Sequence, residues 1–512
     1  MSTQKYNRRQ FVKFAGALGT GIPAAALTAC NAESRSDTLA ETSTTAAPAS
    51  NCTRKFPDGF FWGTATSSYQ IEGAWNEDGK GLSIWDTFAH TPGNMRNNDT
   101  GDVANDHYHR YKEDVQLMKS IGQNAYRFSI SWPRIFPNGT GQPNPKGIDF
   151  YDRLVDELVA ADIAPFPTLY HWDLPQALHD KGGWQNRDIA KMFADYAGLV
   201  AEKLSDRVGH FFTINEFRSF TQAGYRGFEV PAPGTPEGFR VVHLAPGLRL
   251  SLADLYQVRH HSVLAHGMAV QAIRAKGKKG TKVGPAENIE TAAPLIETPE
   301  NIKAAETATR ELNAPFLTVM LEGKYTDNYL KDAGKDAPKF TDEDLKIIGS
   351  PLDFVGINVY VPTYVEASEE ASGWTKIPFA NGHAKTAIAN FPICPEVLYW
   401  APRHVQKLWN AREIYITENG CASEDVIAEN GKVYDTDRVM FMKAFLMQLQ
   451  LATSQDVPVK GYFYWSAMDN LEWTAGFGNR YGIVHVDFKT QKRTPKVSAE
   501  FFREVARNNE VV

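Results

Sequence analysis

Short apolar runs alternate with amphipathic segments along the chain from residue 54 onward. The runs are five to seven residues long, which is a usual length for a buried strand. Several are followed by residues with the apolar spacing of a helix, as in Ile148–Ala161 and Ile189–Leu204. Eight runs are predicted to be strands: Phe60–Thr64, Asn124–Ser129, Pro165–Tyr170, Phe211–Asn215, Lys282–Asn288, Asp353–Asn358, Ile414–Glu418 and Gly461–Ser466.

Eight strand–helix alternations favour a closed barrel over an open doubly wound sheet. The sequence has no Gly-rich dinucleotide fingerprint, phosphate-binding loop or paired Cys/His metal spacing. The interval from Glu216 to Lys282 exceeds a normal crossover, and Pro231, Pro233 and Pro236 in it predict irregular structure. We therefore expect an α/β fold, a single (β/α)8 TIM barrel with long βα loops, over residues 54–512.

The first 29 residues have the order of elements found in an export signal. Asn7-Arg8-Arg9-Gln10-Phe11-Val12-Lys13 resembles a twin-arginine signal, and Leu27-Thr28-Ala29-Cys30 resembles a bacterial lipobox. The apolar stretch between them is too short and too rich in glycine for a membrane-spanning helix, which needs about 20 apolar residues. We expect residues 1–29 to be a signal peptide for the twin-arginine pathway, with lipidation at Cys30 and a periplasmic or cell-envelope location. The alternative is a short apolar segment with a chance cysteine.

Residues 30–53 are dominated by Ala, Ser, Thr and Glu and contain few large apolar side chains. Such a composition buries too little surface to fold, so we expect a flexible tether. Four cysteines in 512 residues do not make a disulfide scaffold. Beyond Cys30 the chain has Cys52, Cys394 and Cys421, an odd set in which at most one disulfide can form.

The overall composition narrows the choice of partners. The formal net charge is −6 and no basic run occurs outside the N-terminus, which argues against nucleic acid. Aromatic residues make up 12% of the chain, which suits stacking on sugar rings, although large cores also use aromatic side chains. The only membrane contact we expect is the N-terminal lipid, and the sequence does not indicate an oligomeric state.

Two glutamates stand directly at the ends of predicted strands. Glu216 closes Thr213-Ile214-Asn215-Glu216, and Glu418 lies in Ile416-Thr417-Glu418-Asn419-Gly420. A charge at the end of a buried strand is not explained by packing, because burying an unpaired charge is costly. Two carboxylates, one as acid/base and one as nucleophile, are what the hydrolysis of a glycoside requires.

Other strand ends carry side chains suited to a sugar. Amides, imidazole and carboxylates hydrogen-bond hydroxyl groups, and indoles stack on the apolar face of a ring. A barrel brings the carboxyl ends of its strands together. The residues at these ends are Gln70, Glu72, Arg127, His171, Trp172, Asn215, Asn358, Tyr360 and Trp465, with Glu472 and Trp473 just beyond the last strand.

Ordered blocks between residues 54 and 505 resemble glycoside hydrolase family 1, the β-glucosidase family. They are Phe60–Ala74 (FFWGTATSSYQIEGA), Tyr126–Arg134 (YRFSISWPR), Tyr170–Pro175 (YHWDLP), Asp353–Asn358 (DFVGIN), Ile416–Gly420 (ITENG) and Trp465–Trp473 (WSAMDNLEW).

The resemblance implies a retaining double displacement. Glu418 would attack the anomeric carbon, and Glu216 would act as acid and then as base, with the two carboxyl groups roughly 5–5.5 Å apart. Arg127 and Tyr360 match positions beside the nucleophile, and Asn215 matches the residue that binds the sugar 2-hydroxyl. The negative charge of Glu418 is expected to raise the pKa of Glu216.

The resemblance also implies a substrate-binding set and needs no metal or organic cofactor. Relatives that act on 6-phosphorylated sugars replace the carboxylate at Glu472 and add a nearby Lys; here residues 473–478 contain no Lys. We therefore expect a non-phosphorylated glycone, glucose with tolerance of galactose or fucose. The expected substrate-binding residues are Gln70, His171, Asn215, Asn358, Trp465, Glu472 and Trp473.

The chain departs from the family pattern on the Glu216 side. Phe217 stands where the family usually has Pro, the loop from Tyr225 to Pro246 is expanded, and Asn313-Ala314-Pro315-Phe316 lacks a family Trp. The predicted fifth strand, Lys282–Asn288, is more polar than expected. Our hypothesis is ordinary glycone recognition with an unusual aglycone site.

The leading interpretation is a retaining β-glucosidase that hydrolyses terminal β-D-glucosyl residues of small glycosides or oligosaccharides. Transglycosylation by the same glycosyl-enzyme is one alternative. A catalytically inactive sugar-binding protein is another, although such proteins usually lose a catalytic carboxylate and both are present here.

Overall fold

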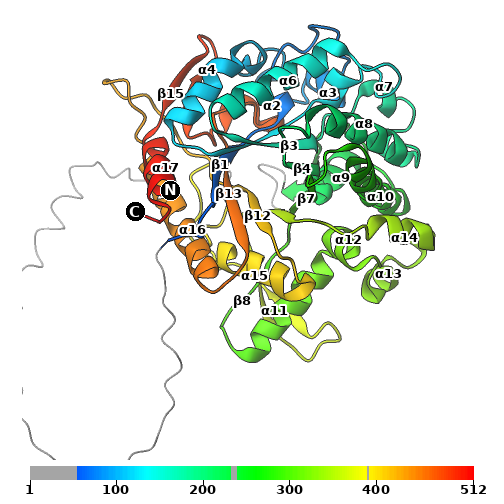
Figure 1. The fold of residues 1–512 in the computed structure, drawn as a ribbon. Coiled ribbons are helices and arrows are strands. Elements are labelled where there is room, and N and C mark those ends of the chain that lie inside the picture. Colours follow the sequence, from blue (N-terminus) through cyan, green and yellow to red (C-terminus); the bar gives the residue numbers. More distant parts are fainter. Residues whose placement is uncertain (1–54, 232–238, 389–390) are drawn as a thin grey trace, which may run out of the picture. The chain divides into compact units, whose positions relative to one another are not determined.

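The computed structural model describes residues 55–231, 239–388 and 391–512. The predicted signal peptide, the tether and Cys30 lie outside these residues. The described chain is built around eight parallel strands (Figure 1). They are β1 (Phe61–Ala65), β2 (Ala125–Ser129), β3 (Ala164–Tyr170), β4 (His210–Asn215), β7 (Lys282–Asn288), β9 (Val355–Asn358), β12 (Ile414–Asn419) and β13 (Val459–Trp465).

The eight strands close into a barrel in the order β1-β13-β12-β9-β7-β4-β3-β2. Closure is direct, because β1 pairs in parallel with β2 on one side and with β13 on the other. Each strand coincides with one of the eight predicted runs, and no boundary differs by more than two residues. The predicted (β/α)8 barrel is therefore confirmed, and the open doubly wound sheet is excluded.

Large rings fill the barrel interior, and glycines make room for them. A Cβ atom on Gly284 would lie 2.7 Å from the ring of Phe354, and one on Gly356 would lie 2.7 Å from the ring of Phe212. Because aromatic rings lie beside glycines on neighbouring strands, the interior side chains fit together at the density of a packed core. The buried interior rings are Phe166, Phe212, Phe354, Tyr415 and Phe463.

Helices surround the barrel, as α8, α9 and α10 do beside β3, β4 and β7 in Figure 1. The predicted helices Ile148–Ala161 and Ile189–Leu204 correspond to α6 and α8. The longest helix after each barrel strand is, in order, α4 (His107–Ser120), α6 (Pro145–Ala160), α8 (Ile189–Leu204), α10 (Leu252–Lys276), α11 (Pro299–Leu312), α15 (Val397–Trp409), α16 (Thr436–Ser454) and α17 (Val497–Asn508).

The loops carry further short elements. The helices are α2 (Ser68–Ile71), α3 (Ile84–His90), α5 (Trp132–Ile135), α7 (Gln176–His179), α9 (Phe217–Tyr225), α12 (Val319–Glu322), α13 (Asp327–Ala333) and α14 (Asp342–Ile348). The strands are β5 (Phe228–Pro231) with β6 (Phe239–Val242), β8 (Ala292–Pro294) with β10 (Thr363–Ala367) and β11 (Trp374–Ile377), and β14 (Val484–Asp487) with β15 (Lys492–Pro495).

The expanded loop after β4 is partly regular. Strands β5 and β6 pair antiparallel, so the prediction of irregular structure is wrong at these residues. Pro231 is compatible with the hairpin because it ends a strand of a two-stranded sheet, where a missing N–H interrupts little pairing. Pro233 and Pro236 lie outside the described residues.

The described residues also bear on disulfide bonds and on membrane-spanning helices. Cys394 and Cys421 are both free and buried, so no disulfide joins them. Among residues 55–231, 239–388 and 391–512, no helix has the length and apolar character needed to cross a membrane.

Candidate active site

One cavity of about 370 Å³ contains both predicted glutamates. Glu216 directly follows β4, and Glu418 is the last residue but one of β12. Both are buried, at 7% and 4% exposure. The cavity is lined by His171, Trp172, Asn215, Glu216, Asn288, Tyr360, Val361, Phe391, Glu418, Trp465, Glu472, Trp473 and Tyr481.

Glu418 is held from both carboxyl oxygens. Nη1 of Arg127 donates to Oε1 over 2.7 Å, and the Tyr360 hydroxyl donates to Oε2 over 3.1 Å. The buried guanidinium also donates to the Thr417 carbonyl and to Oδ1 of Asn215, which fixes its plane. The fork geometry of arginine thus orients the carboxylate and supplies the opposite charge.

Glu216 has uncharged donors. Nδ2 of Asn358 donates to its Oε1 over 2.8 Å, and Ser219 adds a hydroxyl. Burial raises the pKa of Glu216, against the effect of these donors and of Arg127. The expected rise is therefore present, but its main cause is loss of water rather than the charge of Glu418.

The two carboxyl groups share one cavity, and the charge of Glu216 affects the pKa of Glu418. Burial raises the pKa of Glu418 to about 7; Arg127 lowers it, and Glu216 raises it further. A cation stabilises a carboxylate more than neutral donors do. Because the cation contacts Glu418, we infer that a proton shared by the pair resides on Glu216.

Asn215 connects Arg127 to His171. Its Oδ1 accepts from Arg127 over 2.6 Å and from Asn358 over 3.1 Å, and its Nδ2 donates to Nε2 of His171 over 3.0 Å. Burial and the nearby guanidinium lower the pKa of His171 far below its ordinary value, so the ring is neutral. Its proton is then on Nδ1, a buried atom with no hydrogen-bond partner among the described residues.

Glu472 provides a third carboxyl group in the cavity. Nε2 of Gln70 contacts its Oε2 at 3.4 Å and donates to the Leu471 carbonyl over 2.9 Å. Burial raises the pKa of Glu472 to about 8, and the charge of Glu418 adds to the rise. When ionised, such a carboxyl group accepts hydrogen bonds from neutral hydroxyls, and when protonated it can also donate one.

Aromatic rings form the wall beside these carboxyl groups. The ring centroids of His171 and Trp465 are 5.8 Å apart with planes inclined by 26°, and those of Trp172 and Trp473 are 4.5 Å apart. Nε1 of Trp172 donates to the Asn215 carbonyl over 3.0 Å. The wall offers flat apolar faces to a ring ligand.

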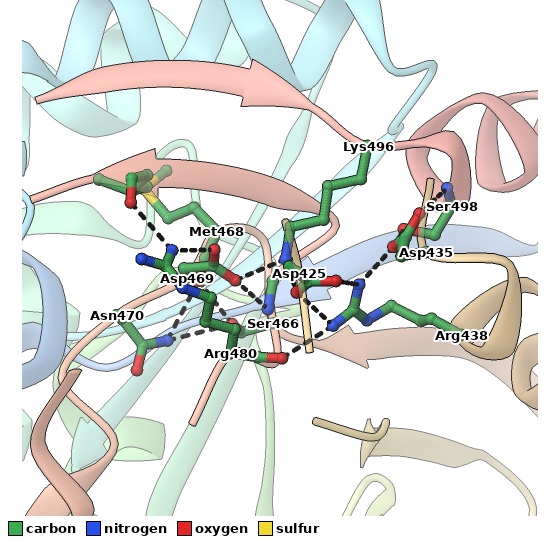
Figure 2. A network of polar contacts seen from close by, with 12 residues as sticks. Asp425, Asp435, Arg438, Ser466, Met468, Asp469, Asn470, Arg480, Lys496 and Ser498 are labelled. Carbon is green, nitrogen blue, oxygen red and sulfur yellow. Dashed lines mark hydrogen bonds and ion pairs between the residues drawn. The ribbon is translucent and has the colours of Figure 1, made fainter. Parts of the chain in front are cut away.

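The segment from Trp465 to Trp473 rests on a buried ionic network (Figure 2). Asp469 accepts from Lys496 and from Arg480, each over 2.6 Å. Lys496 also bonds Asp425, which pairs with Arg438. The side chains of Lys496, Asp425, Asp469 and Arg438 are fully buried, so each charge depends on its partners.

The structure brings the predicted residues together with one exception. Gln70, Arg127 and Asn358 do not line the cavity but bond residues that do. Glu72, which stands near the end of the first predicted strand, is instead bonded by Arg134 and Tyr151 and contributes nothing to the cavity.

Sequence reasoning missed four lining residues. Tyr481, Val361, Phe391 and Asn288 lie in loops or at a strand end without a periodic signal. Only Asn288, which ends the predicted strand Lys282–Asn288, could have been found by its position.

Two departures from the family pattern lie behind the cavity. Phe217 and Pro315, which stands at the position of the family Trp, are both buried, and neither lines the cavity. Neither departure therefore contributes a side chain to the cavity wall, and the Phe217 ring instead packs 6.1 Å from that of Phe316.

Comparison with known proteins gives a consistent result. The description "Glycosyl hydrolase family 1" belongs to the family profile that matches residues 52–511. The chain is 43% identical over 457 residues to a 1,4-beta-D-glucan glucohydrolase of Thermotoga neapolitana, covering 89% of this chain and 99% of the relative. It is also 43% identical to beta-glucosidase A of Thermotoga maritima, covering 89% and 98%. The solved structure of a Thermotoga maritima beta-glucosidase in complex with glucoimidazole is 42% identical, covers 89% of this chain and 100% of its own, and has a TM-score of 0.79.

Proposed function

Because this chain belongs to glycosyl hydrolase family 1, we propose that it is a retaining β-glucosidase that releases terminal, non-reducing β-D-glucosyl residues. The observation that carries the proposal is the pair Glu216 and Glu418, two buried carboxyl groups in one cavity with different hydrogen-bond donors. One is suited to be an anion and the other to hold a proton, which is the state that the first step requires.

The reaction follows from these positions. A carboxylate oxygen of Glu418 forms a bond to the anomeric carbon while the glycosidic bond breaks, and the leaving oxygen takes the proton of Glu216. The ionised Glu216 then removes a proton from water, whose oxygen displaces Glu418. Two inversions at the same carbon give retention. Arg127 and Tyr360 hold Glu418 in its orientation, and Asn215 and His171 line the cavity that receives the sugar hydroxyls.

Hydrolysis of 4-nitrophenyl β-D-glucoside, followed by NMR of the first sugar released, tests the proposal. We expect β-glucose before mutarotation. Glu418→Gln should lose activity by several orders of magnitude, whereas Glu413→Gln, at the opposite end of β12 and paired with Lys282, should keep it. Equal background rates in wild type and Glu418→Gln would point to a sugar-binding protein, and an α-product would exclude retention.

We propose a non-phosphorylated glycone. The support is Glu472, a carboxyl group in the cavity that brings no positive charge for a phosphate, together with the absence of Lys in residues 473–478. The rates on 4-nitrophenyl β-D-glucoside and on its 6-phosphate should differ strongly in favour of the first. A preference for the phosphate would overturn this assignment.

We propose that the unusual part of the aglycone site is the β5–β6 hairpin. Val241 and Val242 of β6 line a second cavity of about 660 Å³ together with Thr474, which directly follows Trp473 of the first cavity. Trimming residues 226–243 should change KM for cello-oligosaccharides more than for 4-nitrophenyl glucoside. Equal effects on both substrates, or none, would remove the hairpin from aglycone binding.

We also propose export by the twin-arginine pathway and anchoring by a lipid at Cys30, on the support of the sequence of residues 1–30 alone. Cys30→Ser should abolish incorporation of labelled fatty acid, and replacing Arg8 and Arg9 by Lys should retain the precursor in the cytoplasm. Normal labelling or export in these variants would contradict the proposal.

A further inference from the structure

The backbone at Glu216 is tied on both sides to the neighbouring strand β7. The Glu216 N–H donates to the Ala286 carbonyl over 2.8 Å. The next N–H, of Phe217, donates to Oε2 of Glu287 over 2.6 Å, and the Arg218 N–H approaches Oε1 at 3.3 Å. Two consecutive residues of β7, Ala286 and Glu287, therefore hold the backbone of Glu216 and Phe217 by hydrogen bonds.

Glu287 acts as the cap of helix α9. The first N–H groups of a helix lack partners within it, and a side chain at the N-cap position usually accepts them. Here Glu216 is the N-cap residue but makes no capping hydrogen bond, and its φ of 49° lies in the left-handed region. Glu287 supplies the missing acceptor from another strand, so the Glu216 carboxyl group is free to face the cavity.

The substitution of Phe217 for the usual Pro explains why a cap is needed. Proline has no N–H, whereas Phe217 brings a donor into a fully buried position. A buried donor without a partner costs roughly 1–3 kcal/mol. Glu287, which contributes to the unusual polarity of the fifth barrel strand, therefore supplies the acceptor that Phe217 requires.

The surroundings of Glu287 shift its pKa in opposite directions. Burial raises its pKa to about 8, whereas Arg218 and the two backbone donors lower it. The Arg218 guanidinium lies over the ring of Phe316 at 5.8 Å and pairs with Glu290 at 3.1 Å. Phe217, Arg218, Glu287 and Phe316 form one connected cluster behind the acid/base residue.

We propose that Glu287 is a positioning residue for Glu216: by capping α9 from β7 it holds the acid/base carboxyl group in the orientation that proton transfer requires. The inference rests on the proposed glucosidase function. It predicts a defect in proton donation rather than in sugar binding or in nucleophilic attack by Glu418.

The test compares substrates that differ in their need for an acid. Phenyl β-D-glucoside has a poor leaving group, whereas 2,4-dinitrophenyl β-D-glucoside departs without protonation. Glu287→Leu should lower kcat/KM for the phenyl glucoside by about 10- to 100-fold and for the dinitrophenyl glucoside by less than about threefold. The double variant Phe217→Pro/Glu287→Leu removes the Phe217 donor, which makes the shorter of the two contacts, and should recover part of the lost activity. Glu413→Gln is the matched control.

The outcomes distinguish a failure of the proposed glucosidase function from a failure of the proposed role of Glu287. If wild type hydrolyses neither glucoside, the proposed function fails. If wild type is active but Glu287→Leu loses both activities equally, or neither, Glu287 has no positioning role. Should Glu287→Leu not fold, Glu287→Met, which is closer in shape to Glu and also lacks an acceptor oxygen, carries the same comparison. No change in its leaving-group dependence would likewise overturn the inference.

Discussion

Arg127 and Glu418 form a buried ion pair with 2.7 Å between Nη1 and Oε1. Both side chains are buried, so the guanidinium is the main compensation for an ionised Glu418. Tyr360 completes the arrangement at the other carboxyl oxygen. The contacts with Arg127 and Tyr360 therefore give Glu418 a fixed orientation as well as an opposite charge. Two variants separate these contributions.

Arg127→Lys keeps the positive charge but loses the planar fork. A lysine cannot contact Glu418, Asn215 and the Thr417 carbonyl together, so we expect kcat/KM to fall by about 100-fold while the fold is retained. Arg274→Lys, in a partly exposed pair with Asp353, is the control and should be silent. Full activity in Arg127→Lys would mean that charge alone suffices.

Tyr360→Phe removes one donor and leaves the ring in place. A hydrogen bond to a charged group contributes about 1.5–3 kcal/mol, which corresponds to roughly a 10- to 100-fold loss of kcat. KM should change little, because the hydroxyl contacts Glu418. Steady-state kinetics of the purified variant checks this, and a rise in KM with unchanged kcat would instead assign Tyr360 to ground-state binding.

Glu472 makes stability depend on pH. Burial raises its pKa from 4.5 to about 8, so between these values the folded protein holds a proton that the unfolded chain releases. Its contribution is present below pH 4.5 and is lost as the pH rises through 8, by at most about 1.4 kcal/mol per pH unit. Glu472→Gln cannot ionise, so its melting temperature relative to wild type should increase from pH 5 to pH 8. A constant difference would show that Glu472 is already ionised at pH 5.

The sequence was sufficient for features that depend on local pattern. All eight barrel strands were predicted, and all but the polar fifth strand are apolar runs, because a parallel barrel buries both faces of each strand. Glu216 and Glu418 were found because a charge beside such a run is unusual. Their meeting in one cavity depended on the barrel, whose closure places strand ends from distant parts of the chain together.

Features that depend on contacts between strands could not be predicted. Glu287 was visible only as excess polarity in the fifth strand, since its function as a helix cap requires α9 to lie beside β7. Tyr481 lines the cavity from a loop without periodicity. The cause of the pKa rise at Glu216 was also assigned wrongly, because burial is a property of the folded chain.

Lys496 should be essential to the stability of the segment that carries Trp465 and Glu472. Its ammonium group lies between Asp425 and Asp469, and all three side chains are fully buried (Figure 2). Lys496→Met would leave two carboxylates short of a cation, and breaking a buried pair in this way costs about 3–5 kcal/mol.

Urea unfolding of Lys496→Met measures this cost, with Lys432→Met as the matched control. Lys432 is exposed and lies 3.8 Å from Glu500, so its replacement should change the free energy of unfolding by less than about 0.5 kcal/mol. Asp469 stands between Trp465 and Glu472 in the same segment, and Ser466 and Asn470 connect that segment to Gln70. Any folded Lys496→Met should therefore also show a raised KM for glucosides. Equal stability of the two variants would mean that the network stabilises the barrel no more than a surface pair does.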